Sequence, residues 1–389
     1  MRTLPMIALL SVAAFVLAGC AGTTDTTQAP TTATTGPTHA TTTASAAGPT
    51  SPFEMPSKST QVAGSGATFP KPLLESWGIS YAQMQPKVQV SYGGGGSGKG
   101  ISDITAKNVV FGATDAPMQV TEKANAQKNG ETILQFPETL GLQDLVYNVP
   151  GVPDHLKLDA DTVARIYIGQ VTKWDDAAIA ALNPGVALPA SAIATVSRSD
   201  SSGTTFAFTD WLNHASPAWM NGPFPGASKK PAWATQLSGN GNDGVGSLVK
   251  STPNSIGYVE LAYVRSLKLN SAMVKAHDGA FLLPSTDGAA KAAAGVAGSL
   301  PAPDGDWSKV SIVDAPAAGA WPISTFTYIM VYNDVAAYGG KASADQMHAF
   351  QSWMWWCLHD GQAQSDALGY APLPSAVVPI GEAALKAIH

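Results

Sequence analysis

The chain has 389 residues, of which 45% are hydrophobic and only 13% charged, and its formal net charge is -6. This charge argues against a nucleic-acid-binding protein, because such proteins carry a basic face toward the phosphate backbone. It does not exclude binding of a small anion, since local dipoles suffice for that. The length favours two lobes rather than one, and the composition is that of an α/β protein.

The N-terminus predicts export. Residues 6–16 form an apolar run that fits the core of a secretory signal and is short for a membrane span. The run ends in L-A-G-C, which resembles the lipobox of bacterial lipoproteins. That resemblance implies a signal peptide at residues 1–19, a lipidated Cys20, and a location at the extracytoplasmic face of the cell membrane.

We expect a flexible tether after the lipidated cysteine, over residues 20–56. This stretch consists mostly of Thr, Ala, Pro and Ser. It cannot bury enough apolar surface to offset its chain entropy. The folded part should therefore begin near Ser57.

Two glycine-rich turns follow one another at the start of the folded part. The first, residues 64–70, follows a predicted strand, and Pro70 is expected at the first helical position, so that Thr68 and Phe69 present backbone N–H groups at a helix start. The second, residues 93–100, follows a strand at 88–92, with Ser97 expected at the cap of the next helix. Both turns are candidate anion sites.

The second glycine run also invites two nucleotide-binding interpretations. Residues 93–99 match G-x-x-x-x-G-K, but Gly100 stands where a P-loop needs Ser or Thr for Mg²⁺. The run contains G-x-G-x-x-G as well, a weak signal where glycine is so frequent. We therefore favour neither nucleotide-binding interpretation. Both motifs share one physical feature that this turn retains, which is that glycines allow backbone N–H groups to approach a phosphate.

Asp115 ends the next apolar strand, at residues 109–114. Loops at the carboxyl ends of strands are where open α/β sheets bind ligands, although a single Asp there is also an ordinary turn residue. A further strand is expected at 145–149, and residues 151–153 mark the passage to a second lobe.

The second lobe contains the stretch R-S-D-S-S-G-T-T-F, residues 198–206, after a strand at 193–196. Ser202 stands at the N-cap of a helix, and Thr204 lies among its first free backbone N–H groups. With the Arg198 guanidinium, this helix start forms a socket for a tetrahedral oxyanion. Taken alone, the stretch also fits a capped surface helix with an Arg–Asp ion pair.

The remaining chain predicts a tight loop at 238–244, a strand at 255–260 and a return to the first lobe at 321–330. Cys357 has no partner once Cys20 is assigned to lipid. It repeats at helical spacing with Met347, Phe350 and Met354, which predicts a buried, inert thiol.

These motifs together resemble the phosphate-binding lipoproteins and periplasmic proteins of bacterial phosphate ABC transporters, the PstS family. The resemblance covers essentially all of the chain after the tether, in order, and includes G-S-G-A-T-F-P, F-G-A-T-D-A-P, I-Y-I-G-Q-V-T-K-W-D-D and R-S-D-S-S-G-T-T-F. It implies a two-lobed α/β periplasmic-binding-protein fold of type II, with the ligand in the interlobe cleft. We expect lobe I at residues 57–145 with 320–389, and lobe II at 146–319.

The resemblance also implies the phosphate ligands. They fall on Thr68, Phe69 through its backbone N–H, Ser97, Asp115, Arg198, Ser202, Gly203 and Thr204, with Asp200 orienting the arginine. It further implies a monomer that delivers inorganic phosphate to permease subunits and carries no cofactor or metal. Lys99 and Ser201 depart from the family pattern, and the effect of Lys99 on affinity stays open.

Asp115 beside an anion has a specific interpretation. An ionised carboxylate only accepts hydrogen bonds, so it can accept the proton that phosphate carries but must repel sulfate, which has none. An enzyme is not expected, because the sequence contains no nucleophile elbow and its seven histidines show no ligand spacing. A surface adhesin or antigen with this fold and another ligand remains the alternative.

Overall fold

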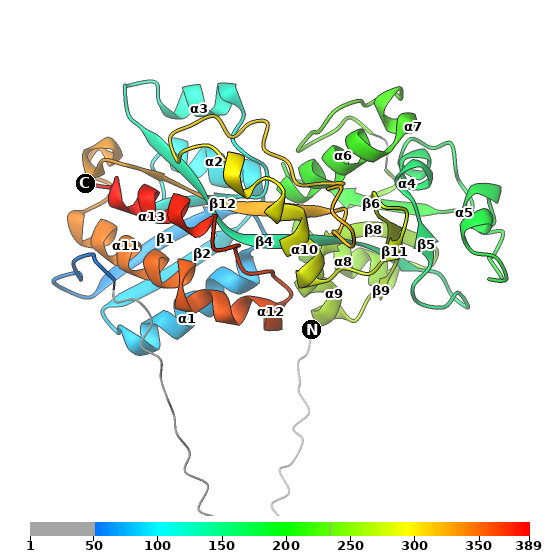
Figure 1. The fold of residues 1–389 in the computed structure, drawn as a ribbon, viewed down its shortest axis with the longest axis horizontal. Helices are drawn as coiled ribbons and strands as arrows, with labels where there is room; N and C mark the ends of the chain where they lie inside the picture. Colours follow the sequence, from blue (N-terminus) through cyan, green and yellow to red (C-terminus); the bar gives the residue numbers. More distant parts are fainter. Residues whose placement is uncertain (1–50, 234) are drawn as a thin grey trace, which may run out of the picture. The chain divides into compact units, whose positions relative to one another are not determined.

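The computed structural model describes residues 51–233 and 235–389, so the predicted signal peptide, Cys20 and most of the tether lie outside the described residues. The described elements form two groups that we call lobe I and lobe II (Figure 1). Within the described ranges, no helix is both long and apolar enough to span a membrane.

Lobe I is built on the strand order β2-β1-β3-β12-β4, in which the first three strands are parallel and β12 is antiparallel to its neighbours. The helices α2 and α3 cover one face of this sheet, and α1 and α11 cover the other (Figure 1). The bounds are β1 Thr60–Gly66, α1 Lys71–Met84, β2 Val88–Gly94, α2 Ser97–Thr105, β3 Phe111–Thr114, α3 Val120–Ala126, β12 Ser324–Tyr332 and α11 Ala344–Leu358.

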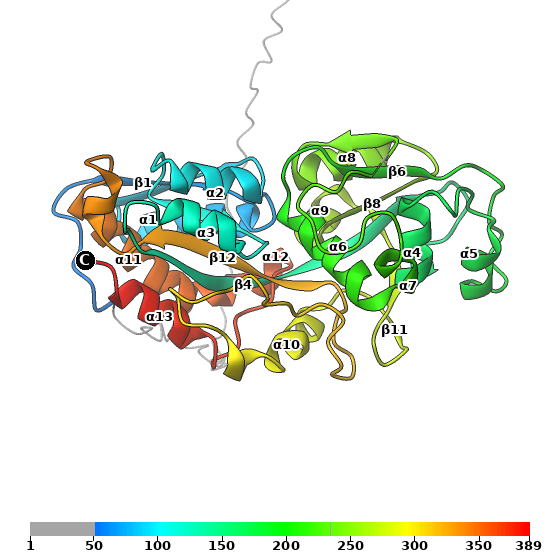
Figure 2. The same cartoon turned by 90° about the horizontal axis from the view of Figure 1, so that it is seen from above.

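The long strand β4, Ile133–Asn148, passes from lobe I into lobe II (Figure 2). Its first part pairs with β12, and its last part, from Gln143, pairs with β8. The sequence predicts a strand only at 145–149. The sequence does not predict the earlier part of β4, because that part contains Pro137 and several polar residues. In the structure, Pro137 is accommodated beside a register irregularity in β12.

Lobe II is built on β4, β8, β6 and β7, with β6 parallel to both of its neighbours. In Figure 1, α4, α6 and α7 lie on one side of these strands and α8 and α9 on the other. The bounds are α4 Ala160–Tyr167, α5 Ala177–Leu182, β6 Ala194–Arg198, α6 Gly203–Ala215, α7 Pro217–Met220, β7 Leu237–Gly239, α8 Gly241–Ser251, β8 Ser255–Glu260 and α9 Leu261–Leu267.

Smaller elements complete the described chain. A three-stranded sheet joins β5, β10 and β11, and β9 pairs with β4. Their bounds, with those of the remaining helices, are β5 Lys157–Leu158, β9 Asn270–Ser271, β10 Met273–Lys275, β11 Phe281–Leu282, α10 Thr286–Ala294, η1 Ala297–Ser299, η2 Val335–Tyr338, η3 Asp360–Gln364, α12 Ser365–Leu368 and α13 Val378–Lys386.

Each lobe has its own aromatic cluster. In lobe I, Phe111 stacks on Phe350 of α11, with ring centroids 5.5 Å apart. In lobe II, Phe208 of α6 stacks on Tyr258 of β8 at 4.4 Å. Cys357 is buried and unpaired, as the sequence predicts. Each lobe therefore has its own packed interior, and the ends of strands that face the other lobe are not needed for that packing.

The expected lobe boundaries stay a prediction. The backbone N–H of Gln135 in β4 donates to the Pro303 carbonyl, and Trp307 packs edge-on against Tyr328 of β12 at 5.5 Å. This part of the segment between α10 and β12 therefore lies against strands of lobe I, although the boundary at residue 319 would assign it to lobe II.

Candidate functional site

The predicted site residues lie at carboxyl ends of strands in both lobes. β1, β2, β3 and β6 each end one to three residues before a site residue or, for Arg198, on it. α1, α2 and α6 begin close after three of these ends. A helix start carries free backbone N–H groups and about half a positive charge, so these starts together favour an anion.

Arg198 is the cation of the site. Its side chain is 1% exposed, and it forms a two-pronged ion pair with Asp200, Nε to Oδ1 at 2.8 Å and Nη2 to Oδ2 at 2.6 Å. Nη1 donates to Thr204 Oγ1 at 2.9 Å. Asp200 thus fixes the plane of the guanidinium, as the family resemblance implies for this position.

The start of α6 matches the sequence prediction. Ser202 is the N-cap, and its Oγ accepts the Thr205 N–H at 3.0 Å. Gly203 and Thr204 are the first helical residues, so their N–H groups have no acceptor within the helix. The groups predicted to form the oxyanion socket of lobe II therefore lie within one short stretch of the chain.

The lobe I half contains Ser97 and Asp115. The Asp115 N–H donates to Ser97 Oγ at 3.1 Å, and Asp115 Oδ2 lies 3.4 Å from the same hydroxyl. Both residues are at most 1% exposed. Among the described residues, Asp115 Oδ1 has no hydrogen-bond partner, which leaves a buried acceptor in the site.

Burial raises the pKa of the Asp115 carboxyl to about 8, and the Arg198 guanidinium and Ser97 hydroxyl offset only part of that effect. The sequence interpretation took this carboxyl as ionised. The structure corrects that view, because with a pKa of about 8 the group keeps its proton near neutral pH when no anion is bound, even beside the Arg198 guanidinium. An oxyanion and Asp115 can then share one proton, whichever of them carried it first.

The two halves of the site are in contact. A Cβ on Gly203 would lie 2.3 Å from Ser97 Oγ and 2.6 Å from Asp115 Oδ2, so only glycine allows this approach. The Gly98 N–H donates to the Ser201 carbonyl at 2.9 Å. Outside the site, Lys229 Nζ pairs with Glu122 Oε1 of α3 at 2.5 Å. The two lobes are thus closed against each other at the site.

Thr68 and Phe69 are held through their carbonyl groups. Tyr263 of α9 donates to the Thr68 carbonyl at 2.6 Å, and Tyr370 donates to the Phe69 carbonyl at 2.6 Å. Both residues of the turn are buried. The turn before α1 is therefore positioned by tyrosines that come from distant parts of the chain.

Asn242 is the residue of this site that the sequence analysis missed. It is fully buried, and its side-chain amide donates to Thr68 Oγ1 at 3.0 Å and to Thr204 Oγ1 at 3.3 Å. The sequence predicts only a tight loop at 238–244, before a helix. A buried amide directly after a glycine-rich turn was the available signal, but its partners lie far away in the sequence.

Two local expectations differ from the structure. Gly96 rather than Ser97 is the N-cap of α2, because Gly96 has φ +92° and its carbonyl already accepts the N–H groups of Lys99 and Gly100. Pro70 is the N-cap of α1 rather than its first residue. Lys99 pairs with Asp103 at 2.5 Å, so its charge is compensated within α2.

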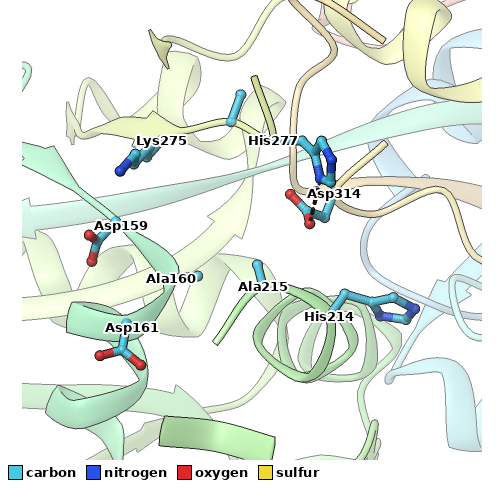
Figure 3. Close-up of a pocket in the computed structure, with 9 residues that line it drawn as sticks. Asp159, Ala160, Asp161, His214, Ala215, Lys275, His277 and Asp314 are labelled. Carbon is cyan, nitrogen blue, oxygen red and sulfur yellow. Dashed lines mark hydrogen bonds and ion pairs between the residues drawn. The ribbon is translucent and has the colours of Figure 1, made fainter. Parts of the chain in front are cut away.

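The pocket in Figure 3 shares no residue with this site. It lies in lobe II, between the start of α4, the end of α6 and β10, and its charged groups are largely paired with one another or with neighbours. The dashed line marks His277 Nδ1 and Asp314 Oδ2, which are 3.1 Å apart. The described residues contain no group of three or more His, Cys, Asp or Glu side chains suited to a metal ion.

The chain was compared with known proteins. Residues 26–355 match the model of the PBP superfamily domain. A phosphate-binding protein PstS from Methanocaldococcus jannaschii is 35% identical over 334 residues, covering 83% of this chain and 85% of the relative. One from Xylella fastidiosa is 34% identical over 335 residues, covering 85% and 86%.

Solved structures share the fold. A high-affinity periplasmic phosphate-binding protein, PfluDING, solved with bound phosphate, aligns with a TM-score of 0.64 at 18% identity, over 83% of this chain and 93% of that protein. The two-lobed periplasmic-binding-protein fold expected from the sequence is therefore confirmed. The extent and level of sequence identity show that this chain belongs to the PstS family of the PBP superfamily.

Proposed function

We propose that this protein binds inorganic phosphate outside the cytoplasm and delivers it to the permease of an ABC transporter. The observation that carries the proposal is the buried site between the lobes, where Arg198 and the hydroxyl and N–H groups of both lobes gather beside Asp115, whose Oδ1 has no hydrogen-bond partner among the described residues. Phosphate offers several acceptors and one proton, and this set of groups complements both.

The proposed ligands are those predicted from the sequence: Thr68, Phe69, Ser97, Asp115, Arg198, Ser202, Gly203 and Thr204, with Asp200 orienting Arg198. Three observations support them. They all lie in or beside one buried cluster, they come from both lobes, and the family's curated members are named as phosphate-binding proteins. The protein acts as a binding protein and not as an enzyme.

The binding test uses purified protein stripped of bound anion by partial unfolding and dialysis. Labelled inorganic phosphate should bind to one site per chain, and at pH 9, above the raised pKa of Asp115, excess sulfate should displace it poorly. Absence of phosphate binding at millimolar concentration would refute the proposal and favour a different ligand for the same fold, as in the adhesin alternative.

The membrane attachment is a separate proposal. It rests on the L-A-G-C sequence at residues 17–20 and the polar tether that follows, both outside the described residues. Stable membrane attachment needs more than one acyl chain, and the lipidated Cys20 would supply them. The variant Cys20→Ser removes this attachment point, so the protein should move from the membrane fraction into the medium. Unchanged membrane retention would rule out lipidation at Cys20.

A further inference from the structure

Asn242 has an orientation that its surroundings determine. It is the second residue of α8, and its Oδ1 accepts the Glu260 backbone N–H at 3.1 Å. A backbone N–H can only donate, so this side of the amide must be the oxygen. The Nδ2 group, with its two hydrogens, therefore faces Thr68 and Thr204.

This orientation determines how the two threonine hydroxyls are used. Thr68 Oγ1 accepts from Asn242 twice, from the backbone N–H at 3.1 Å and from Nδ2 at 3.0 Å. Thr204 Oγ1 accepts from Asn242 Nδ2 at 3.3 Å and from Arg198 Nη1 at 2.9 Å. All of these partners are donors and none can accept.

A hydroxyl has two acceptor positions and one hydrogen to donate. Because both acceptor positions of Thr68 and of Thr204 are occupied, the hydrogen of each must point away from Asn242 and Arg198. Within the part of the chain that the structure describes, neither hydroxyl donates to a protein acceptor. Each lobe thus presents one hydroxyl hydrogen that is available to an anion.

We propose that Asn242 is a positioning residue that fixes Thr68 and Thr204 as hydrogen-bond donors to the bound oxyanion, one from each lobe. This inference rests on the proposed function. Asn242 lies in lobe II and reaches Thr68 in lobe I, so its bonds to Thr68 require the closed cleft. The hydroxyl of lobe I is therefore oriented as the lobes close on the ligand.

The test measures binding of labelled inorganic phosphate to the purified full chain and to the variant Asn242→Ala. Loss of orientation at two hydroxyl donors should weaken binding by about tenfold. The matched control is Asn240→Ala, which removes the same side chain from an exposed position two residues away where it makes no capping hydrogen bond. The control should stay within about twofold of the wild type.

A second measurement separates positioning from a merely structural role. In the background Thr68→Val with Thr204→Val, both hydroxyls are absent, so adding Asn242→Ala should weaken binding by less than about twofold. A further tenfold loss in this background would mean that Asn242 acts through other groups, and it would overturn the inference.

The remaining outcomes are also decisive. If Asn242→Ala does not fold, Asn242→Ser is used, whose single hydroxyl cannot serve both threonines, and wild-type affinity in that variant would refute the inference. If the wild type binds phosphate and Asn242→Ala binds it equally well, only this inference fails. If the wild type does not bind phosphate, the proposed function fails.

Discussion

Lobe II supplies its proposed phosphate ligands from one short stretch, residues 198–204, whereas lobe I supplies its proposed ligands from the ends of three strands. In lobe II, Asp200 and Thr204 bind Arg198 within a few residues. In lobe I, Ser97 meets Asp115 only because β1, β2 and β3 pair in parallel register. The lobe II half is thus formed locally, while the lobe I half and the contact between them depend on the whole fold.

The largest loss of phosphate affinity is expected when the lobe II half of the site loses its cation, Arg198. Arg198→Ala should weaken phosphate binding by about 30-fold to several thousandfold, corresponding to roughly 2–5 kcal/mol, because it also leaves the Asp200 carboxylate, which is 12% exposed, near the anion without its cationic partner. Titration with labelled phosphate measures the change. The control Arg165→Ala removes an arginine that is half-exposed and paired with Asp161 on a helix surface, and it should have little effect.

A double variant sharpens this prediction. Arg198→Ala with Asp200→Ala removes the unpaired carboxylate as well, so part of the lost affinity should return. Wild-type phosphate affinity in the single variant Arg198→Ala would remove Arg198 from the site.

The next largest loss of phosphate affinity is expected when the contact between the lobe I and lobe II halves of the site is disturbed. Gly203→Ala places a methyl group where Ser97 Oγ and Asp115 Oδ2 lie, and overpacking of this kind costs roughly 1–3 kcal/mol, or about 5- to 150-fold in phosphate affinity. Small-angle scattering should also show a larger radius of gyration with phosphate than in the wild type. The control Gly295→Ala adds a methyl group that meets nothing within 4 Å. Normal closure in the Gly203 variant would contradict the packing argument.

The third prediction concerns selectivity in lobe I. The raised pKa of Asp115, about 8, means that its carboxyl can donate to sulfate below that pH and only repels sulfate above it. Sulfate affinity of the wild type should therefore fall as the pH rises through about 8. In Asp115→Asn the amide donates at every pH, so this fall should vanish.

The same variant should change the competition between the two anions. At pH 9, the ratio of sulfate to phosphate affinity in Asp115→Asn should rise roughly tenfold over the wild type, which amounts to about one hydrogen bond to a charged group. Competition of each unlabelled anion against labelled phosphate gives the ratio. An unchanged ratio would show that Asp115 does not discriminate between the anions.

The smallest effect is expected outside the site. Lys229 and Glu122 join the lobes as a partly exposed ion pair, with side chains 13% and 26% accessible. Such pairs contribute up to about 1 kcal/mol, so Lys229→Met should weaken phosphate binding by no more than about fivefold, and less at high salt. The neighbouring Lys230→Met is the control. A loss as large as that in Arg198→Ala would make this ion pair a main determinant of closure.

The sequence by itself determined what depends on neighbouring residues. It predicted the N-cap Ser202, a strand at 193–196 that leads to Arg198 and the buried Cys357, because capping and helical periodicity act over one or two turns. The family resemblance supplied the fold and the set of proposed ligands.

Only the tertiary structure decided what depends on distant partners. The raised pKa of Asp115 follows from burial between two lobes, which no local pattern records. β4 continues through Pro137 because β12 pairs with β4 residues both before and after that proline. Asn242 joins Thr68 to Thr204 only where α8 meets the turn before α1. These features arise from long-range packing, in which the stabilising contacts join residues that are far apart in the sequence.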